Sequence, residues 1–161
     1  MIDKDLLTKE IERDLDGTSL FLVELSVSPA NDIRVEIDSA EGVDIEACAK
    51  LTRQIEAAFD RDKEDYELEV GSSGLTSPFK VRAQYAKNIG NDIEILTKDG
   101  RKLYGVLTDV GAGNPLDKDV NFTMEMEHKV KEPGAKRPVL KKEALGFSSA
   151  DCKYVRYDIK F

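Results

Sequence analysis

The spacing of apolar residues changes character partway along the chain, and this change limits the folds that the sequence can adopt. Up to about residue 83, segments with helical spacing alternate with segments that have strand spacing; beyond it, short strand-like runs are separated by Gly and Pro. Helix and strand segments together favour a helix-covered sheet, whereas many short strands favour a small barrel. At 161 residues, the chain can form two domains of about 80 residues each. The pattern therefore predicts an α+β protein with domains at residues 1–83 and 84–161.

The first domain is expected to contain two helices and three strands in the order helix, strand, strand, helix, strand. Apolar residues recur every four positions over residues 3–15, which predicts an amphipathic helix that ends at Gly17. Asp44 is suited to cap a second helix. Alternation of apolar and polar residues predicts strands, the first two forming an antiparallel hairpin, over residues 20–28, 33–37 and 66–70.

One face of this predicted sheet should be polar and mostly acidic. If the helices cover the apolar face, the alternate positions of the three strands point to solvent. A surface of this charge suits a basic protein better than RNA. The residues expected on this face are Glu24, Arg34, Glu36, Glu67 and Glu69.

The second domain is expected to be a small β-barrel of the SH3 or Sm-like type. A short helical turn over residues 84–89 precedes it, and Asp99-Gly100 provides the strongest turn signal. Five short strands separated by tight turns are typical of such barrels. They are predicted over residues 92–97, 102–110, 120–130, 139–144 and 154–159.

A basic segment stands out within this second domain. Between residues 129 and 142 the chain has six basic residues and one acid, Glu132, and Pro133-Gly134 near the middle favours a hairpin turn. The segment could be an RNA-contacting hairpin whose charges meet phosphates, or a soluble hairpin whose lysines protect a sheet edge. The basic residues are Lys129, Lys131, Lys136, Arg137, Lys141 and Lys142.

Net charge and hydropathy exclude several classes of protein. The formal charge is −8, and residues 1–88 hold 11 Lys and Arg against 20 Asp and Glu, whereas residues 89–161 hold 13 against 12. An acidic body does not favour bare nucleic acid, although the second half could meet RNA locally. No apolar run is long enough for a membrane span, and the N-terminus has no signal-peptide pattern. We expect a cytoplasmic monomer that does not bind membranes.

No residue pattern in the sequence supports catalysis, a cofactor or a metal. The segment Gly71-Ser-Ser-Gly74 has neither the Lys of a phosphate-binding loop nor the spacing of a nucleophile elbow. It also lacks the basic flanks of the Gly-x-x-Gly loop in KH domains. His128, the single histidine, lies in a charged strand, and Cys48 and Cys152 lack partners at metal-ligand spacing. We therefore predict a protein that is not an enzyme and has no cofactor, with both cysteines reduced.

Two motifs in the first half of the chain resemble those of one known protein family. The first is Ile33-Arg-Val-Glu-Ile-Asp-Ser-Ala-Glu-Gly-Val-Asp-Ile-Glu-Ala-Cys48, a strand that ends in Ile-Asp followed by an acidic Gly turn and a helix. The second is Tyr66-Glu-Leu-Glu-Val-Gly-Ser-Ser-Gly-Leu75 with Pro78-Phe79, similar to the family's Leu-Glu-Val-Ser-Ser-Pro-Gly-Leu-Asp-Arg-Pro-Leu. Both motifs resemble those of the bacterial ribosome maturation factor RimP family. The resemblance continues through Tyr85 and Gly90-Asn-Asp-Ile-Glu-Ile, so it covers most of the chain.

The resemblance implies a non-catalytic factor that binds the small (30S) ribosomal subunit during its assembly. It implies two contacts, one with rRNA and one with a basic ribosomal protein near the decoding centre. It also implies an α/β N-terminal domain and an Sm-like barrel. The alternative is a free-standing Sm-like adaptor that binds RNA or protein through the barrel alone.

The second motif departs from the family pattern within its loop. Ser73 replaces the family's Pro, and Thr76-Ser77 replaces its Asp-Arg. We expect this loop to end the third strand and to set the junction between domains, with two glycines that allow positive φ. If the missing Arg contacts rRNA in the family, the basic hairpin could supply that contact here. The loop residues are Gly71, Ser72, Ser73, Gly74 and Pro78.

Overall fold

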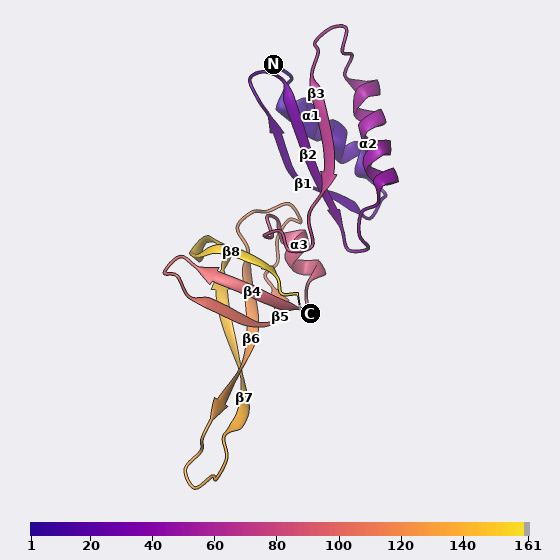
Figure 1. Ribbon diagram of the computed structural model, residues 1–161. Coiled ribbons are helices and arrows are strands. Elements are labelled where there is room, and N and C mark those ends of the chain that lie inside the picture. Colours follow the sequence, from indigo (N-terminus) through magenta and orange to yellow (C-terminus); the bar gives the residue numbers. More distant parts are fainter. Residues whose placement is uncertain (160–161) are drawn as a thin grey trace. The chain divides into compact units, whose positions relative to one another are not determined.

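The computed structural model describes residues 1–159, which form two units, Met1–Gly74 and Leu75 onward (Figure 1). This division falls before the predicted boundary at residue 83. The reason is packing, because Phe79 joins the apolar core of the second unit and its amide N–H donates to the Val155 carbonyl at 2.8 Å. In this part of the chain, no helix combines the length and the apolar character needed to cross a bilayer.

The first unit has the predicted order of two helices and three strands. Both helices begin at an aspartate, because Asp3 accepts hydrogen bonds from the amides of its first turn and Asp44 accepts from Ala47 N at 2.8 Å. Gly17, with φ of 77°, follows the end of the first helix as predicted. The elements are α1 Lys4–Leu15, β1 Leu20–Val27, β2 Asp32–Ser39, α2 Ile45–Ala58 and β3 Glu67–Ser72.

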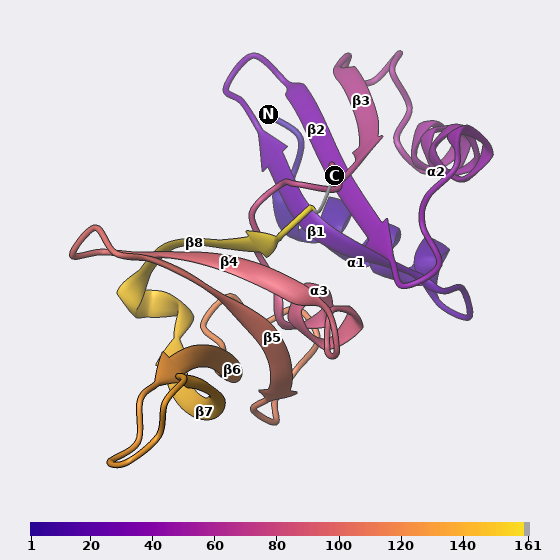
Figure 2. The same cartoon turned by 60° about the horizontal axis from the view of Figure 1, so that its bottom comes forward.

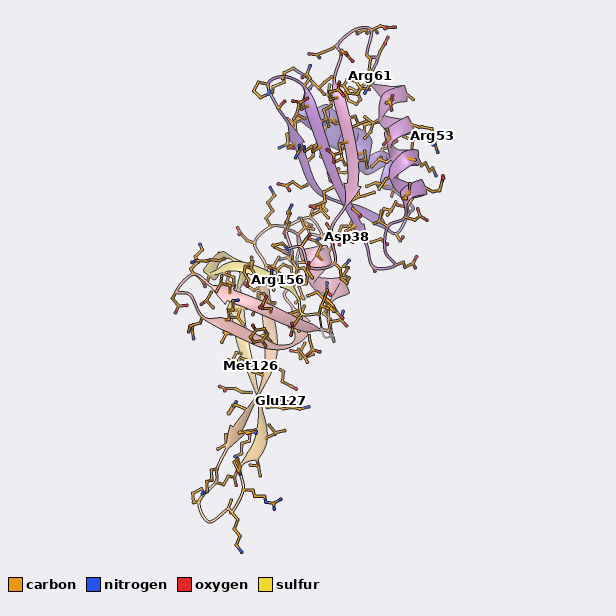
Figure 3. The ribbon with its side chains drawn as sticks, in the orientation of Figure 1. Asp38, Arg53, Arg61, Met126, Glu127 and Arg156 are labelled. Carbon is orange, nitrogen blue, oxygen red and sulfur yellow. The ribbon has the colours of Figure 1, made fainter. Side chains whose placement is uncertain are left out.

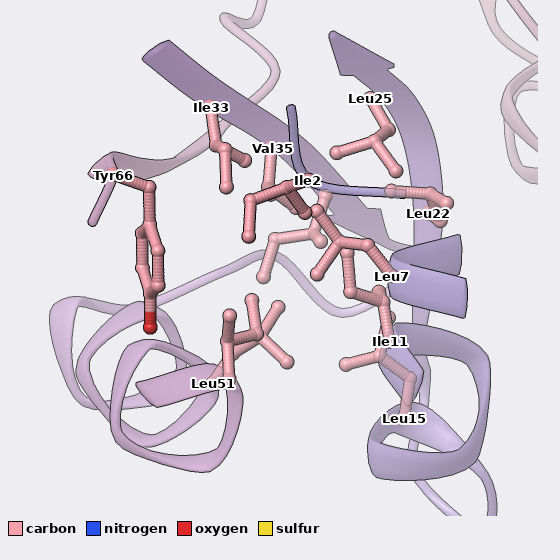
Figure 4. Close-up of a cluster of buried hydrophobic side chains, with 12 residues drawn as sticks. Ile2, Leu7, Ile11, Leu15, Leu22, Leu25, Ile33, Val35, Leu51 and Tyr66 are labelled. Carbon is pink, nitrogen blue, oxygen red and sulfur yellow. The ribbon is translucent and has the colours of Figure 1, made fainter. Parts of the chain in front are cut away.

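The three strands form a mixed sheet in the order β1-β2-β3. The predicted hairpin of β1 and β2 is antiparallel, and β3 pairs with β2 in parallel. A parallel pair requires a crossover, which α2 provides. Both helices pack on the same face of the sheet, where Leu7, Ile11 and Leu51 join Val35 in one buried cluster (Figure 4).

The second unit contains one short helix and a five-stranded sheet. The Asp99-Gly100 turn joins the first two of these strands as predicted, with Gly100 at φ of 90°. The last two strands differ from the predicted ranges: β7 runs four residues further, and β8 begins and ends two residues earlier, because strand pairing continues where apolar alternation does not. The elements are α3 Arg82–Lys87, β4 Asp92–Thr97, β5 Lys102–Val110, β6 Asn121–Val130, β7 Val139–Ser148 and β8 Cys152–Tyr157.

This sheet curls strongly. Its strand order is β7-β6-β5-β4-β8, so β7 and β8 stand at opposite ends of the order. In a flat sheet these strands would lie about 19 Å apart, since neighbouring strands are about 4.8 Å apart. Only the 3₁₀ turn Ser149–Asp151 separates the end of β7 from the start of β8, and such a short segment reaches about 14 Å at most (Figure 2). The sheet must therefore curl, while a closed SH3 or Sm-like barrel stays a prediction.

A close contact between β5 and β6 accompanies this curl. A Cβ atom on Gly105 would lie 2.5 Å from the Glu125 carbonyl oxygen and 2.8 Å from Met124 Cγ, so only glycine fits there. Inside the sheet, Tyr85 packs against Phe79 and Phe122, with ring centroids 5.1 and 5.2 Å apart. These aromatic rings fill the core that the curled sheet encloses.

Candidate functional site

The five charged residues predicted for the sheet surface of the first unit lie on one face. Residues directly opposite each other in a sheet point to the same side. Glu24 pairs with Glu36, and Arg34 pairs with Glu69, while residues two apart on one strand share a face. We call this surface, made of Glu24, Arg34, Glu36, Glu67 and Glu69, the acidic face.

The acidic face is open to solvent and slightly hollowed. Glu36 is half-buried and the other four residues are exposed. Glu24, Glu36 and Glu69 line a hollow of about 350 Å³ together with Arg34. The face therefore offers carboxylates around a depression that is wide enough for a side chain of another molecule.

The charges on this face do not balance. Glu24 and Glu36 stand directly opposite each other, so two carboxylates lie side by side on this face. Arg34 is the one cation of the face, and its ion pair with Glu69, at 3.8 Å, is long and joins two side chains that are 78% and 77% exposed. Such an exposed pair contributes little to stability. The four carboxylates give the face an acidic character that would attract a cationic partner.

The predicted junction loop belongs in part to the sheet. Gly71 and Ser72 are the last residues of β3, and Gly71 pairs with Glu36. The prediction that the strand ends at Val70 is therefore wrong, because β2 continues to offer pairing positions beyond it. Ser73 extends this pairing by donating its N–H to the Ile37 carbonyl at 3.1 Å. The first unit ends at Gly74, and Pro78 follows within the second unit.

The predicted basic hairpin is formed by the distal parts of β6 and β7 (Figure 1). Pairing of β6 with β5 stops at Glu125, so beyond this residue β6 pairs with β7 alone. The predicted turn is confirmed: the Ala135 N–H donates to the Glu132 carbonyl at 3.0 Å, and Gly134 has φ of 82°. Pro followed by Gly in this geometry is a type II turn. We call residues 129–142 the basic arm.

The six cations of the basic arm differ in their surroundings. Lys141 forms an ion pair with Glu132, and Lys142 lies 3.6 Å from Glu125. For the other four, the described part of the chain contains no ion-pair partner, and all four are exposed. Figure 3 shows nitrogen-ended side chains around the tip. These four cations are Lys129, Lys131, Lys136 and Arg137.

A charged network on the second sheet was missed by the sequence analysis. The buried Glu94 of β4 accepts hydrogen bonds from Tyr104 Oη at 3.0 Å, Tyr154 Oη at 3.2 Å and Arg156 Nε at 2.5 Å. Burial would raise the pKa of Glu94, but the hydrogen bonds from Arg156 and Tyr104 outweigh it and hold this pKa below its ordinary value. The network ties the neighbouring strands β5 and β8 to β4. No sequence signal links Glu94 to residues about 60 positions away.

The remaining reactive side chains do not gather into a site. His128 lies on the arm's base, with Nδ1 at 3.8 Å from Glu143 Oε2, and both groups are solvent-accessible. Cys48 and Cys152 are free thiols whose pKa values are raised, chiefly by burial. Across residues 1–159, no group of three or more His, Cys, Asp or Glu side chains is arranged to hold a metal ion.

Comparison with known proteins gives consistent matches along the chain. Residues 10–76 match the family described as the RimP N-terminal domain. The ribosome maturation factor RimP of Porphyromonas gingivalis (strain ATCC 33277) is 40% identical over 153 residues, which cover 95% of this chain and 96% of that protein. The RimP of Flavobacterium psychrophilum is 28% identical over 92% of this chain and 94% of its own length. That of Christiangramia forsetii is 38% identical over 53% of this chain and 56% of its own.

Proposed function

Because the chain belongs to the family of the ribosome maturation factor RimP, we propose that it binds the small ribosomal subunit during assembly, without catalysing a reaction. The 40% identity to the Porphyromonas gingivalis protein extends over both units, which supports a role that uses the whole chain. In this role the protein is a monomer that acts in the cytoplasm.

The acidic face binds a basic ribosomal protein near the decoding centre. The observation that carries this proposal is the placement of Glu24 opposite Glu36 on a sheet face that no helix covers. With Glu67 and Glu69 they form a surface of four carboxylates and one guanidinium, which attracts a basic partner. Complementary charge also speeds the encounter.

The second unit, which we propose to be an SH3 or Sm-like barrel, contacts rRNA through the basic arm. Four exposed cations near one turn can contact several phosphates at once, and their affinity should fall as salt increases, because releasing the counterions of the RNA then gains less free energy. If the arginine of the family motif contacts rRNA, the basic arm would replace that contact here, where the chain has Thr76-Ser77. The junction loop then acts geometrically, by joining two binding surfaces.

Neutralising the acidic face tests this proposal. We expect the double variant Glu24→Gln/Glu36→Gln to pellet with isolated small subunits about tenfold less well than the wild type at low salt. A matched control, Glu12→Gln/Glu46→Gln, changes the net charge equally at exposed helix positions of the same unit and should bind as the wild type does. Equal binding of all three proteins would contradict a role for the acidic face. It would favour an adaptor that uses the second unit alone.

A further inference from the structure

An apolar side chain lies among the cations of the basic arm. Leu140 is 65% exposed, and in the pairing of β6 with β7 it stands directly opposite Lys129. Lys141 and Lys142 follow it in the chain. A single exposed leucine needs no explanation by itself, but this one lies within a group of positive charges where the sheet has no other layer.

Packing in the core of the second unit does not explain why an apolar side chain stands at position 140. The buried side chains Phe122 and Met124 of β6 mark the face of the hairpin that points into the core. Leu140 of β7 pairs with Lys129 of β6. Lys129 is an odd number of residues away from Phe122 and Met124, so Lys129 and its partner Leu140 lie on the opposite face of the hairpin. The side chain therefore stays largely exposed and is available to an external ligand.

The charges around Leu140 select the class of that ligand. The two lysines that follow it are paired with Glu132 and Glu125, whereas Lys129 has no ion-pair partner among the described residues and is exposed, as are the three cations of the turn. A ligand must therefore present several anionic groups and, between them, an apolar surface. RNA has both when a base is unstacked, because phosphates then flank an exposed base face.

A regular RNA duplex fits this arrangement poorly. Its bases are stacked inside the helix, its major groove is deep and narrow, and its minor groove presents hydroxyl groups. An aliphatic side chain gains nothing from such a surface, although the cations would still meet phosphates. We propose that the basic arm binds RNA at unpaired nucleotides, with Leu140 packed against an exposed base and the cations of the arm on the flanking phosphates. This inference rests on the proposed contact with rRNA and specifies the kind of RNA.

Fluorescence anisotropy with two labelled RNAs tests the inference. One RNA is a stem closed by a single-stranded loop, and the other is a fully paired duplex of the same number of nucleotides. We expect the wild-type chain to bind the loop RNA at least about fivefold more tightly. Leu140→Ser should lower affinity for the loop RNA about three- to tenfold, leave affinity for the duplex unchanged, and leave the salt dependence unchanged, because no charge is lost.

Two control variants separate this contact from other effects. Leu6→Ser removes another exposed leucine, 56% exposed on α1, and should bind both RNAs as the wild type does. Lys136→Gln/Arg137→Gln should weaken binding to both RNAs and reduce the salt dependence. Unchanged thermal unfolding of Leu140→Ser would show that the fold is intact, as expected for an exposed position.

Equal affinity for the two RNAs, or a loop affinity that Leu140→Ser leaves unchanged, would overturn the inference. These results are distinguishable from failure of the proposed function. If the wild type pellets with small subunits but shows no preference between the RNAs, only the inference fails. If it prefers the loop RNA in a Leu140-dependent way but pellets with no ribosomal particle, the inference holds and the ribosomal role fails.

Discussion

The two units use a sheet in different ways. In the first, helices cover one face of three strands and leave the other face for charged residues, so the binding surface is part of the sheet itself. In the second, five strands curl around their own core, and the cations are carried away from that core by an extended hairpin. The comparison indicates that an open sheet covered on one face provides a surface, whereas a curled sheet needs an extension to do so.

Close packing at Gly105 should make the second unit the more sensitive to a single added methyl group. We expect Gly105→Ala to destabilise that unit by about 2 kcal/mol, because the new Cβ would overlap the Glu125 carbonyl. Urea unfolding followed by amide NMR signals would show loss of the second sheet before the first. Gly146→Ala is the matched control, since a Cβ there meets nothing within 4 Å. Equal effects of the two substitutions would contradict the close contact.

The Glu94 network should give the second unit a loss of stability in acid. Since the folded state holds the pKa of Glu94 below its ordinary 4.5, the ionised side chain stabilises the fold above that value. This stabilisation disappears as the pH falls through the folded-state pKa. We expect Glu94→Gln to cost about 1 to 2 kcal/mol at pH 7, because Arg156 loses a charged partner, and the difference should vanish in acid. Glu127→Gln, at an exposed position on β6, serves as the control; a difference that persists unchanged at low pH would exclude this mechanism.

Asp14 should give the first unit the opposite response to pH. Burial, followed by the neighbouring Glu10, raises the pKa of Asp14 to about 6, and its Oδ2 atom is buried without a hydrogen-bond partner in the described residues. The folded state therefore binds this proton more tightly than the unfolded state does. The loss of folding stability that comes from burying the ionised carboxylate is absent below the ordinary pKa of 3.8 and grows as the pH rises to about 6. We expect Asp14→Asn to stabilise the unit by about 1 kcal/mol at pH 7, and to leave stability unchanged below about pH 4.

The pH dependence of unfolding for this variant, measured between pH 3 and 8, checks the prediction. The exposed Asp62→Asn removes the same charge and should have little effect at any pH. If Asp14→Asn destabilised the first unit at neutral pH, the carboxylate would have to be favourably bound, and the assigned cause of the raised pKa would be wrong.

The spacing of apolar residues predicted the order of the helices and strands in both units. A helix or strand that is buried on one side must have apolar residues at regular intervals. The spacing also grouped the acidic face correctly, since alternation alone decides which side chains share a side. The end of β3 was missed because a glycine suggests a strand end, yet Gly71 still pairs with Glu36. The Glu94 network was missed because it depends on pairing between β4 and β8, which are distant in sequence.

The structure also shows that the six cations of the basic arm have different surroundings, which the sequence does not show. The sequence counts six cations between residues 129 and 142 as equivalent. Cross-strand geometry separates Lys141 and Lys142, which lie beside glutamates, from the four exposed cations nearer the turn. It also places Leu140 on the face of the arm away from the core, a placement that depends on the register of β6 with β7.

Co-sedimentation of the wild-type protein with isolated small subunits, large subunits and complete ribosomes tests the central claim most directly. The measurement should be made at low and at moderate salt, because both proposed surfaces act through charge. We predict selective pelleting with free small subunits that weakens as salt increases. Failure to pellet with any of the three particles at either salt concentration would contradict the proposed role.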